Sequence, residues 1–296
     1  MAQTNSVSCG ICKSDNASIL YRKKDYSIAH CHSCGVRFTV PQPAYTELRQ
    51  LYSKAYYRPW NLEQEAAVKK IKMETFEKRL REIQVWEGSG CHGRILDVGC
   101  ATGFFLEKAQ SLGFEPYGIE LSEFSFEKAR SKFGDSIFYG TIEESPFENN
   151  FFDVITMFDL LEHVKDPVET LRRCRAILKP QGIIVAVLPD VSSITAKLMG
   201  KNWTHHKKEH LYYFSKKTIA ELLRQESYEV VKIAPARKVM NLGYVYHQFT
   251  QYSHHIITPL ITTFYKLLPH NLCNISFQVT MGEMLVIARS ATKRKE

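Results

Sequence analysis

Residues 94–106 read RILDVGCATGFFL, in which an apolar run, a loop of small residues and a second apolar run follow one another. The first run predicts a buried β-strand. The spacing Gly99-x-Ala101-x-Gly103 predicts a tight loop, because small residues let the backbone pass close to a ligand. Phe104 follows at once and begins a predicted helix. This order of strand, loop and helix is typical of the sheet edge at which open α/β proteins bind cofactors.

Apolar and amphipathic runs alternate on both sides of this stretch. Continuous apolar strands that alternate with helices predict a parallel sheet with helices on both faces. The predicted helices are 62–86, 104–112, 122–133, 167–178 and 215–225, the last with Ser215 as its N-cap. The predicted strands are 94–98, 115–120, 137–139, 152–158, 182–188, 229–234 and 281–288.

An acid ends the second of these strands, in the stretch PYGIE. Glu120 lies 17 residues after Gly103, where its carboxylate would accept hydrogen bonds from two ribose hydroxyls. A glycine loop alone is a weak signal, whereas a loop with an acid at the neighbouring strand end is a strong one. The alternative is a dinucleotide-binding dehydrogenase, but the GxGxxG pattern of those proteins needs a glycine at the position of Phe104.

In these motifs the chain resembles the class I S-adenosylmethionine-dependent methyltransferases, over about residues 90–290. LDVGCATG is similar to the first motif of that family, and GIELS is similar to its ribose-binding strand end. FFDVITMFDLLEHV and LKPQGIIVAVLPD resemble the motifs of its fourth and fifth strands. The resemblance implies a Rossmann-like α/β fold with a seven-stranded sheet, whose last strand, here 281–288, is antiparallel.

The resemblance also implies S-adenosylmethionine as the cofactor. Many relatives orient adenine with an acid in a G-D-A-x-x-x-P-F stretch, but this chain has GTIEESPF, with Thr141 in place of the acid. The adenine contact is therefore expected at the backbone of Ile142. The full set of expected cofactor contacts is Asp97, Gly99, Ala101, Gly103, Glu120, Ile142 and Asp159.

Four of the eight cysteines form two knuckles near the start of the chain. The spacing Cys9-x2-Cys12 and Cys31-x2-Cys34 predicts a structural zinc site, because a CxxC turn directs two thiolates at one ion. A disulfide pair and a redox CxxC are the alternatives, but no βαβ unit is predicted here for a redox motif. The remaining cysteines are predicted to be small buried hydrophobic residues: Cys91, Cys100, Cys174 and Cys273.

Three domains are predicted from the placement of these motifs. The motif PQP at 41–43 breaks any helix and limits a zinc-ribbon domain to residues 1–45. Residues 46–90 form a helical connector, and residues 91–296 form the methyltransferase domain. Within it, an aromatic and histidine-bearing segment at 237–278 is predicted to be a lid-like insertion, which would suit an apolar or lipid-linked acceptor.

Two clusters are candidates for acceptor chemistry. In DLLEHV, residues 159–164, Asp159, Glu162 and His163 resemble an ExxEH stretch of ubiquinone-pathway O-methyltransferases that can bind a divalent metal. A second metal at these residues is therefore one alternative, and an acceptor-facing or structural role is the other. EHLYYF begins at Glu209 and resembles a stretch of sugar C-methyltransferases, although the tyrosine of those enzymes two residues earlier is replaced. We expect His210 to be the catalytic base, and His163 and Glu209 are the other candidate catalytic residues.

The function predicted from the sequence is methyl transfer to a small molecule. The favoured acceptor group is a hydroxyl of a sugar, lipid-linked or natural-product substrate. An RNA methyltransferase is the alternative, since the formal net charge is +8, but the basic residues are spread along the chain. A non-catalytic scaffold is a third hypothesis, and the intact loop and Glu120 argue against it. The chain shows no signal peptide and no apolar run that would span a bilayer, so a cytoplasmic location is expected.

Overall fold

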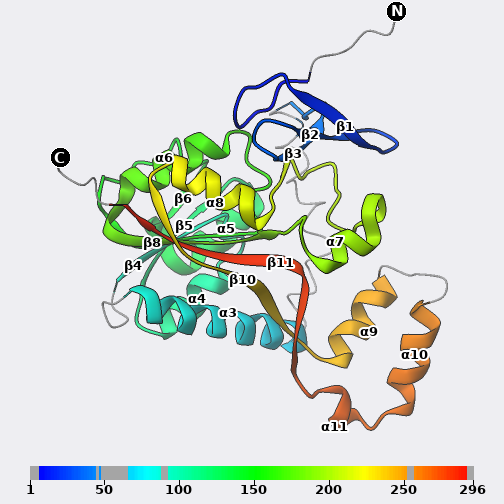
Figure 1. Ribbon diagram of the computed structural model, residues 1–296. Helices are drawn as coiled ribbons and strands as arrows, with labels where there is room; N and C mark the ends of the chain where they lie inside the picture. Colours follow the sequence, from blue (N-terminus) through cyan, green and yellow to red (C-terminus); the bar gives the residue numbers. More distant parts are fainter. Residues whose placement is uncertain (1–6, 45–46, 48–65, 88–92, 252–256, 292–296) are drawn as a thin grey trace, which may run out of the picture.

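The computed structural model describes residues 7–44, 47, 66–87, 93–251 and 257–291 (Figure 1). Several predicted features fall outside the described residues: Cys91, both ends of the predicted connector, and residues 252–256 of the predicted insertion. The chain forms a central seven-stranded sheet and a smaller four-stranded sheet near its N-terminus. None of the helices in the described part combines the length and apolar character needed to cross a bilayer.

The central sheet has the strand order β10-β11-β8-β7-β4-β5-β6. The five strands from β8 to β6 run parallel, and β11 is antiparallel to both of its neighbours. The predicted seven-stranded sheet with an antiparallel last strand is therefore confirmed. Its strands are β4 (Arg94–Val98), β5 (Glu115–Glu120), β6 (Ile137–Tyr139), β7 (Phe152–Phe158), β8 (Leu178–Pro189), β10 (Tyr228–Met240) and β11 (Phe277–Ser290).

Helices cover both faces of this sheet because its buried strands are apolar on both sides. In β8, Ile184 packs into one hydrophobic cluster and Val185 into the other. In Figure 1, α3 and α4 lie on one side of the sheet, and α6 and α8 lie on the opposite side. The helices are α3 (Ala66–Glu87), α4 (Phe104–Ser111), α5 (Glu123–Phe133), α6 (Pro167–Ile177) and α8 (Lys216–Gln225).

Side-chain caps fix where two of these helices begin. The Asp166 carboxylate accepts hydrogen bonds from the main-chain N–H groups of Val168 and Glu169, at 3.1 Å each, at the start of α6. Ser215 forms a capping box with Thr218 at the start of α8, so the predicted N-cap is confirmed. Both helix starts follow loops that lie at the carboxyl edge of the sheet.

The four-stranded sheet joins the N-terminal segment to the core of the protein. Its strands are β1 (Ala17–Arg22), β2 (Ser27–Cys31), β3 (Arg37–Val40) and β9 (Tyr212–Tyr213). The first three lie within residues 1–45, for which the zinc ribbon is predicted, but β9 follows the histidine-rich loop of the core and pairs with β3. Nothing in the sequence predicted this pairing, which places the ribbon directly against that loop.

The last two strands extend into a long hairpin. β10 and β11 pair as far as Met240 and Phe277, well beyond the strands predicted at 229–234 and 281–288. Helices α9 (Leu242–Gln251), α10 (Ile257–Leu267) and α11 (His270–Cys273) follow between them and project from the sheet in Figure 1. The ends of the segment predicted as an insertion, at 237 and 278, therefore lie inside the strand ladder.

Candidate functional site

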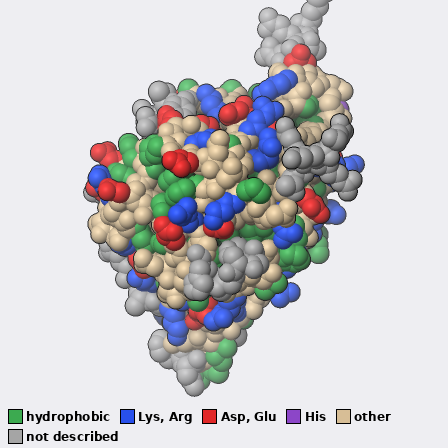
Figure 2. Space-filling view, turned by 90° about the vertical axis from the view of Figure 1, so that its left-hand side faces the viewer, with side chains coloured by type: hydrophobic (Ala, Val, Ile, Leu, Met, Phe, Trp, Pro, Cys, Tyr) green, Lys and Arg blue, Asp and Glu red, His purple; other side chains and the backbone are tan. Residues whose placement is uncertain are grey.

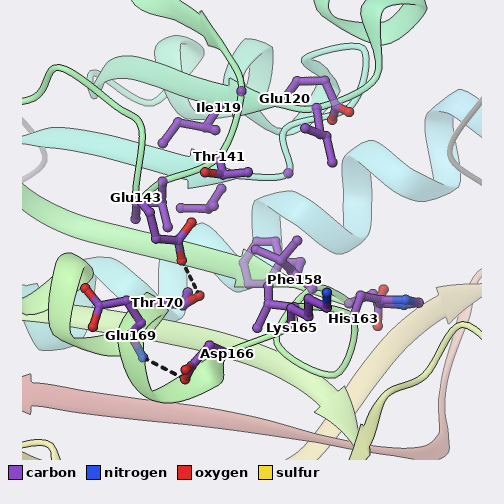
Figure 3. Close-up of a pocket in the computed structure, with 18 residues that line it drawn as sticks. Ile119, Glu120, Thr141, Glu143, Phe158, His163, Lys165, Asp166, Glu169 and Thr170 are labelled. Atoms are coloured by element: carbon purple, nitrogen blue, oxygen red, sulfur yellow. Dashed lines mark hydrogen bonds between the residues drawn. The ribbon is translucent and has the colours of Figure 1, made fainter. Parts of the chain in front are cut away.

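Two cavities meet at the carboxyl ends of β4, β5 and β7. The first has a volume of about 340 Å³ and the second of about 420 Å³. Four residues line both cavities: Gly99, Phe158, Asp159 and His163. In the first cavity, Glu120 and Thr141 lie on one side, and Phe158 and His163 lie on the other (Figure 3). The cavities therefore share one wall, built from the small-residue loop and the end of β7.

The loop after β4 has the backbone conformation that its small residues predict. Gly99 has a φ of +79° and donates its N–H to the carbonyl of Ile119 at 2.8 Å. Gly103 has a φ of +83°, and a Cβ there would lie 2.9 Å from the Phe133 ring. Among the described residues, Gly103 lines neither of the two cavities. Gly99 therefore forms the cavity wall, whereas Gly103 lets α4 pack closely against α5.

Glu120 ties this loop to the end of β5. Its Oε2 accepts the main-chain N–H of Ala101 at 2.9 Å, and its Oε1 accepts that of Ser122 at 2.7 Å. The side chain is buried and lines the first cavity. Ligand hydroxyl groups in this cavity would thus meet an acceptor whose position is already fixed. Ile142 lines the same cavity and forms part of its apolar wall.

A buried network of charged groups lines the second cavity. Asp97 accepts a 2.6 Å hydrogen bond from the Thr156 hydroxyl, and burial raises the pKa of Asp97 to about 7. Arg79, on α3, is 8% exposed and lies with its guanidinium carbon 4.8 Å from the centre of the Phe158 ring. Lys238 on β10 and Glu283 on β11 form an ion pair at 2.6 Å. This wall of the cavity is therefore polar, although most of it is shielded from solvent.

Asp159 stands at the junction of the two cavities in a strained conformation. Its φ is +53°, which is uncommon for a residue with a Cβ, and its N–H bonds to the carbonyl of Val187 at 2.8 Å. Burial opposes its ionisation, but the charges of Lys238 and Arg79 hold the pKa of Asp159 below its ordinary value. Non-glycine residues with positive φ gather at functional sites, where the surrounding structure enforces them.

Histidines from two loops meet in the lining of the second cavity. The His163 and His210 rings lie 4.6 Å apart in an edge-to-face arrangement, and the His205 ring is 6.3 Å from that of His210. His163 Nδ1 donates to the carbonyl of Glu209 at 3.0 Å, so the basic nitrogen of its neutral ring is Nε2. Burial lowers the pKa of His163 to about 4 and that of His210 well below its ordinary value. Both imidazoles are therefore neutral at physiological pH.

Glu162 adds a carboxyl group to this cluster. Ligand atoms of Glu162, His163 and His210 all lie within 4.8 Å of one another. Burial raises the pKa of Glu162 well above its ordinary value. Within the described residues, Glu162 Oε2 and His210 Nδ1 have no hydrogen-bond partner. Two imidazoles and a carboxyl group form a donor set that suits a divalent cation.

The structure brings most of the predicted site residues to the two cavities. Asp97, Ala101 and His210 line the second cavity, and Glu120 and Ile142 line the first. Within the described part of the chain, the Glu209 side chain lines neither cavity, and Glu209 meets the cluster through its main-chain carbonyl. The three-residue donor set contains His210 where the sequence pattern suggested Asp159. Four charged residues that line the second cavity were not predicted from the sequence: Lys72, Arg79, Lys238 and Glu283.

The four N-terminal cysteines converge on one point. Their sulfur atoms lie within 4.8 Å of one another, with 3.7 Å between Cys9 and Cys34 and 3.5 Å between Cys12 and Cys31. A tetrahedral ion with Zn–S bonds of about 2.3 Å separates its sulfur ligands by about 3.8 Å. The distances and the all-thiol donor set both fit zinc. Three of the other cysteines are buried as predicted: Cys100, Cys174 and Cys273.

A family model described as "Methyltransferase domain" matches residues 63–233. Among curated proteins, the ubiquinone biosynthesis O-methyltransferase of Bordetella bronchiseptica is 38% identical over 110 residues, which are 35% of this chain and 46% of that protein. The chain thus spans about half the length of the curated relatives it matches.

Solved structures show the same fold at low sequence identity. A chain from the complex of the Haloferax volcanii Trm112 methyltransferase activator with a methyltransferase aligns at a TM-score of 0.55 and 14% identity, covering 83% of this chain and 98% of that one. A Bacillus halodurans C-125 protein described as a methyltransferase aligns at 0.51 and 16%, covering 72% of this chain and 99% of that one.

Proposed function

Since the chain belongs to the S-adenosylmethionine-dependent methyltransferase family, we propose that it transfers a methyl group to a hydroxyl of a small-molecule acceptor held in the second cavity. The observation that carries this proposal is the pair of imidazoles, His163 and His210, which both line the second cavity with their ring centres 4.6 Å apart. Methyl transfer needs an aligned acceptor, a dry site and, for a hydroxyl, a group that takes its proton.

The cofactor contacts follow from the two cavities. S-adenosylmethionine supplies an electrophilic methyl group on a sulfonium. Glu120 would accept hydrogen bonds from its ribose hydroxyls, and the apolar wall at Ile142 would contact adenine. The methionyl part would lie along the small-residue loop, where the absence of a side chain at Gly99 opens the wall. The residues assigned to this part are Asp97, Gly99 and Ala101, with Asp159 at the junction of the cavities.

His210 is assigned as the base that removes the acceptor proton. A neutral imidazole accepts a proton, and His210 lines the second cavity with His163 beside it. Glu209 would act through its main chain, because its carbonyl holds the His163 ring in one orientation. Burial lowers the pKa of His163 to about 4, and the nearby Asp159 charge offsets only part of that effect, so His163 is assigned to hold the site in place rather than to carry the proton.

The acceptor is assigned to hydroxyl-bearing small molecules because the second cavity has both polar and apolar walls. Arg79 and Lys238 would meet polar groups of the acceptor, whereas Ile71 and Met240 would contact apolar groups. The relatives named ubiquinone biosynthesis O-methyltransferases make phenolic quinone precursors the first acceptors to test. A lipid-linked acceptor is compatible with the apolar part, and a sugar hydroxyl with the polar part.

A divalent cation at Glu162, His163 and His210 is the second way in which this site would activate a hydroxyl, and the clustered donor atoms support it. A bound cation would lower the pKa of an acceptor hydroxyl. Separately, the spacing of the four ribbon cysteines supports a structural zinc ion. Metal analysis of the purified protein, before and after dialysis against a chelator, tests both assignments.

A labelled-methyl assay tests the proposed reaction. Protein and methyl-labelled S-adenosylmethionine are incubated with pools of phenolic quinone precursors, sugar nucleotides, lipid extracts and RNA. Label is expected in a small-molecule pool, whereas label in RNA alone would contradict the proposal. RNA is disfavoured because basic and acidic side chains are mixed across the face in Figure 2, and basic residues pair with acids, as Arg172 does with Glu226 at 2.8 Å.

Two matched variants of the histidine loop then test the base. His210→Phe is expected to abolish transfer to the acceptor found in the screen. His206→Phe is the control, because His206 packs against Trp203 and Tyr213 and, among the described residues, lines neither cavity. Two results would contradict the assignment of His210 as the base: undiminished methyl transfer by His210→Phe, or an equal loss of activity in both variants.

A further inference from the structure

The ribbon contacts the loop that carries the candidate base. This loop runs from Trp203 to Leu211 and continues into β9, which pairs with β3 of the ribbon. Arg37 on β3 is the register partner of Tyr213, and Phe38 is the partner of Tyr212. One edge of the histidine loop is therefore a strand of the ribbon sheet, far from the loop in sequence.

Thr39 makes the contact closest to the base. Its hydroxyl donates to the main-chain carbonyl of His210 at 2.6 Å, and its N–H donates to the carbonyl of Leu211 at 3.0 Å. The Thr39 side chain is fully buried. Water therefore cannot replace the hydroxyl, and its removal would leave the His210 carbonyl buried beside an apolar group.

A second ribbon residue holds the earlier part of the loop. The Tyr26 hydroxyl donates to the carbonyl of His206 at 2.6 Å. The Tyr21 ring lies 5.4 Å from the His206 ring, centre to centre. These contacts come from β1 and from the turn before β2, so the ribbon contacts the loop at these places as well as through β3.

The opposite edge of the loop is attached to the methyltransferase core. The carbonyl of Glu162 accepts the N–H of Leu211 at 2.8 Å and that of Tyr212 at 3.2 Å. His163 donates to the carbonyl of Glu209 at 3.0 Å. The main chain around His210 is thus hydrogen-bonded to the ribbon on one side and, on the other, to Glu162 and His163 in the loop that follows β7.

We propose that the ribbon is a positioning element of the active site, in which the Thr39 hydroxyl fixes the main chain of His210 and the four-cysteine site holds β2 and β3 in place for that contact. Cys31 ends β2, and Cys34 lies in the turn that leads into β3. A zinc ion that joins these cysteines to Cys9 and Cys12 would fix the β2–β3 hairpin. This inference rests on the proposed function because it takes His210 to be the base. The contact between Thr39 and His210 does not depend on that function.

The test compares Thr39→Val with Thr39→Ser in the full-length, zinc-loaded protein. Valine keeps the shape and removes the hydroxyl, whereas serine keeps the hydroxyl. The probe ligand is S-adenosylhomocysteine, so no acceptor is needed. The readouts are hydrogen exchange of the amides of residues 205–213 and the ring Cε1–H resonance of His210 in histidine-labelled protein, assigned with the His210→Phe variant.

Thr39→Val is expected to raise exchange in residues 205–213 about tenfold, as the loss of one buried hydrogen bond implies, and to shift the His210 resonance. Thr39→Ser is expected to stay within about twofold of the wild type. Affinity for S-adenosylhomocysteine is expected to be unchanged in both, because Thr39 lines neither cavity in the described residues. Unchanged exchange and resonance in Thr39→Val would overturn the proposal.

Two further arms keep the proposal testable if Thr39→Val folds poorly. Tyr26→Phe removes only the hydroxyl bonded to His206 and is expected to raise exchange in the same loop. Chelation of zinc is expected to raise exchange in residues 205–213 and to leave residues 137–145, beside the first cavity, as they were. Equal loss of protection in both segments would mean general unfolding and would overturn the positioning role. The exchange and resonance measurements need no acceptor, so they can be made even if the acceptor screen finds no methyl transfer. Failure of the proposed function can therefore be told apart from failure of the positioning role.

Discussion

Replacing Glu120 by glutamine tests the proposed cofactor site most directly. Each carboxylate oxygen accepts one main-chain N–H, from Ala101 at 2.9 Å and from Ser122 at 2.7 Å. Glutamine offers one oxygen and one NH₂ group, so one of these two N–H groups would face another donor. The loop and the side chain therefore cannot both keep their present positions in Glu120→Gln.

The expected cost follows from the burial of this side chain. Glu120 is 4% exposed, so water does not take the place of a lost partner. The ribose hydroxyls of the cofactor would donate hydrogen bonds to this carboxylate, and a hydrogen bond to a charged group contributes about 1.5–3 kcal/mol. We expect a loss of about 2 kcal/mol in binding, which is roughly 30-fold in affinity. Isothermal calorimetry with S-adenosylhomocysteine measures this without an acceptor.

A matched control separates the contact from the change of charge. Glu127 is an exposed acid on α5, and Glu127→Gln removes the same charge away from the cavity. This control is expected to bind like the wild type. Binding of Glu120→Gln within about threefold of the wild type would refute the reasoning, as would an equal loss in the control. Circular dichroism of both variants checks that they are folded.

Three further predictions concern stability. Burial raises the pKa of Asp97 to about 7, above the usual value of 3.8, so the folded state holds a proton and wild-type stability should fall as pH rises from about 4 to 7. Asp97→Asn should therefore have a free energy of unfolding roughly 2–4 kcal/mol larger than that of the wild type at pH 8, seen as a higher thermal midpoint, and should differ little from it at pH 4. Lys238→Met should cost about 2 kcal/mol in urea unfolding, because it leaves Glu283 buried without its ion partner, and the double variant with Glu283→Gln should recover most of this loss. Removing zinc with a chelator should release about one ion per chain and lower the thermal midpoint, whereas a protein without zinc as purified would contradict the metal assignment.

The sheet was predictable because its strands are buried on both faces. Phe152–Phe158 is a continuous apolar run apart from Asp153 and Thr156. Such a run predicts a strand in a parallel sheet that is covered on both faces. The loop after β4 was predictable for a different reason. Its small residues tolerate positive φ at Gly99 and Gly103, and few other arrangements need such residues at this spacing.

The second cavity was much less predictable. Arg79 lies on the connector helix, and Lys238 and Glu283 lie on strands that proved longer than the apolar pattern indicated. Their proximity depends on how α3 crosses the β10–β11 hairpin, which no local pattern encodes. One usable signal was present, because Glu283 interrupts an apolar strand, and a buried acid needs a partner.

Residues proposed to bind the cofactor were easier to predict than residues proposed to bind the acceptor, and the reason is physical. The cofactor side is built from strand ends and turns that are adjacent in the sheet, and its ligand is common to the whole family. The proposed acceptor side is assembled from α3, the β10–β11 hairpin and the loop hydrogen-bonded to Thr39, which are far apart in sequence. Acceptor specificity should therefore respond to changes in these three elements, with little change in affinity for S-adenosylhomocysteine. Arg79→Met gives the sharpest form of this expectation: a raised KM for the acceptor with a kcat that changes less.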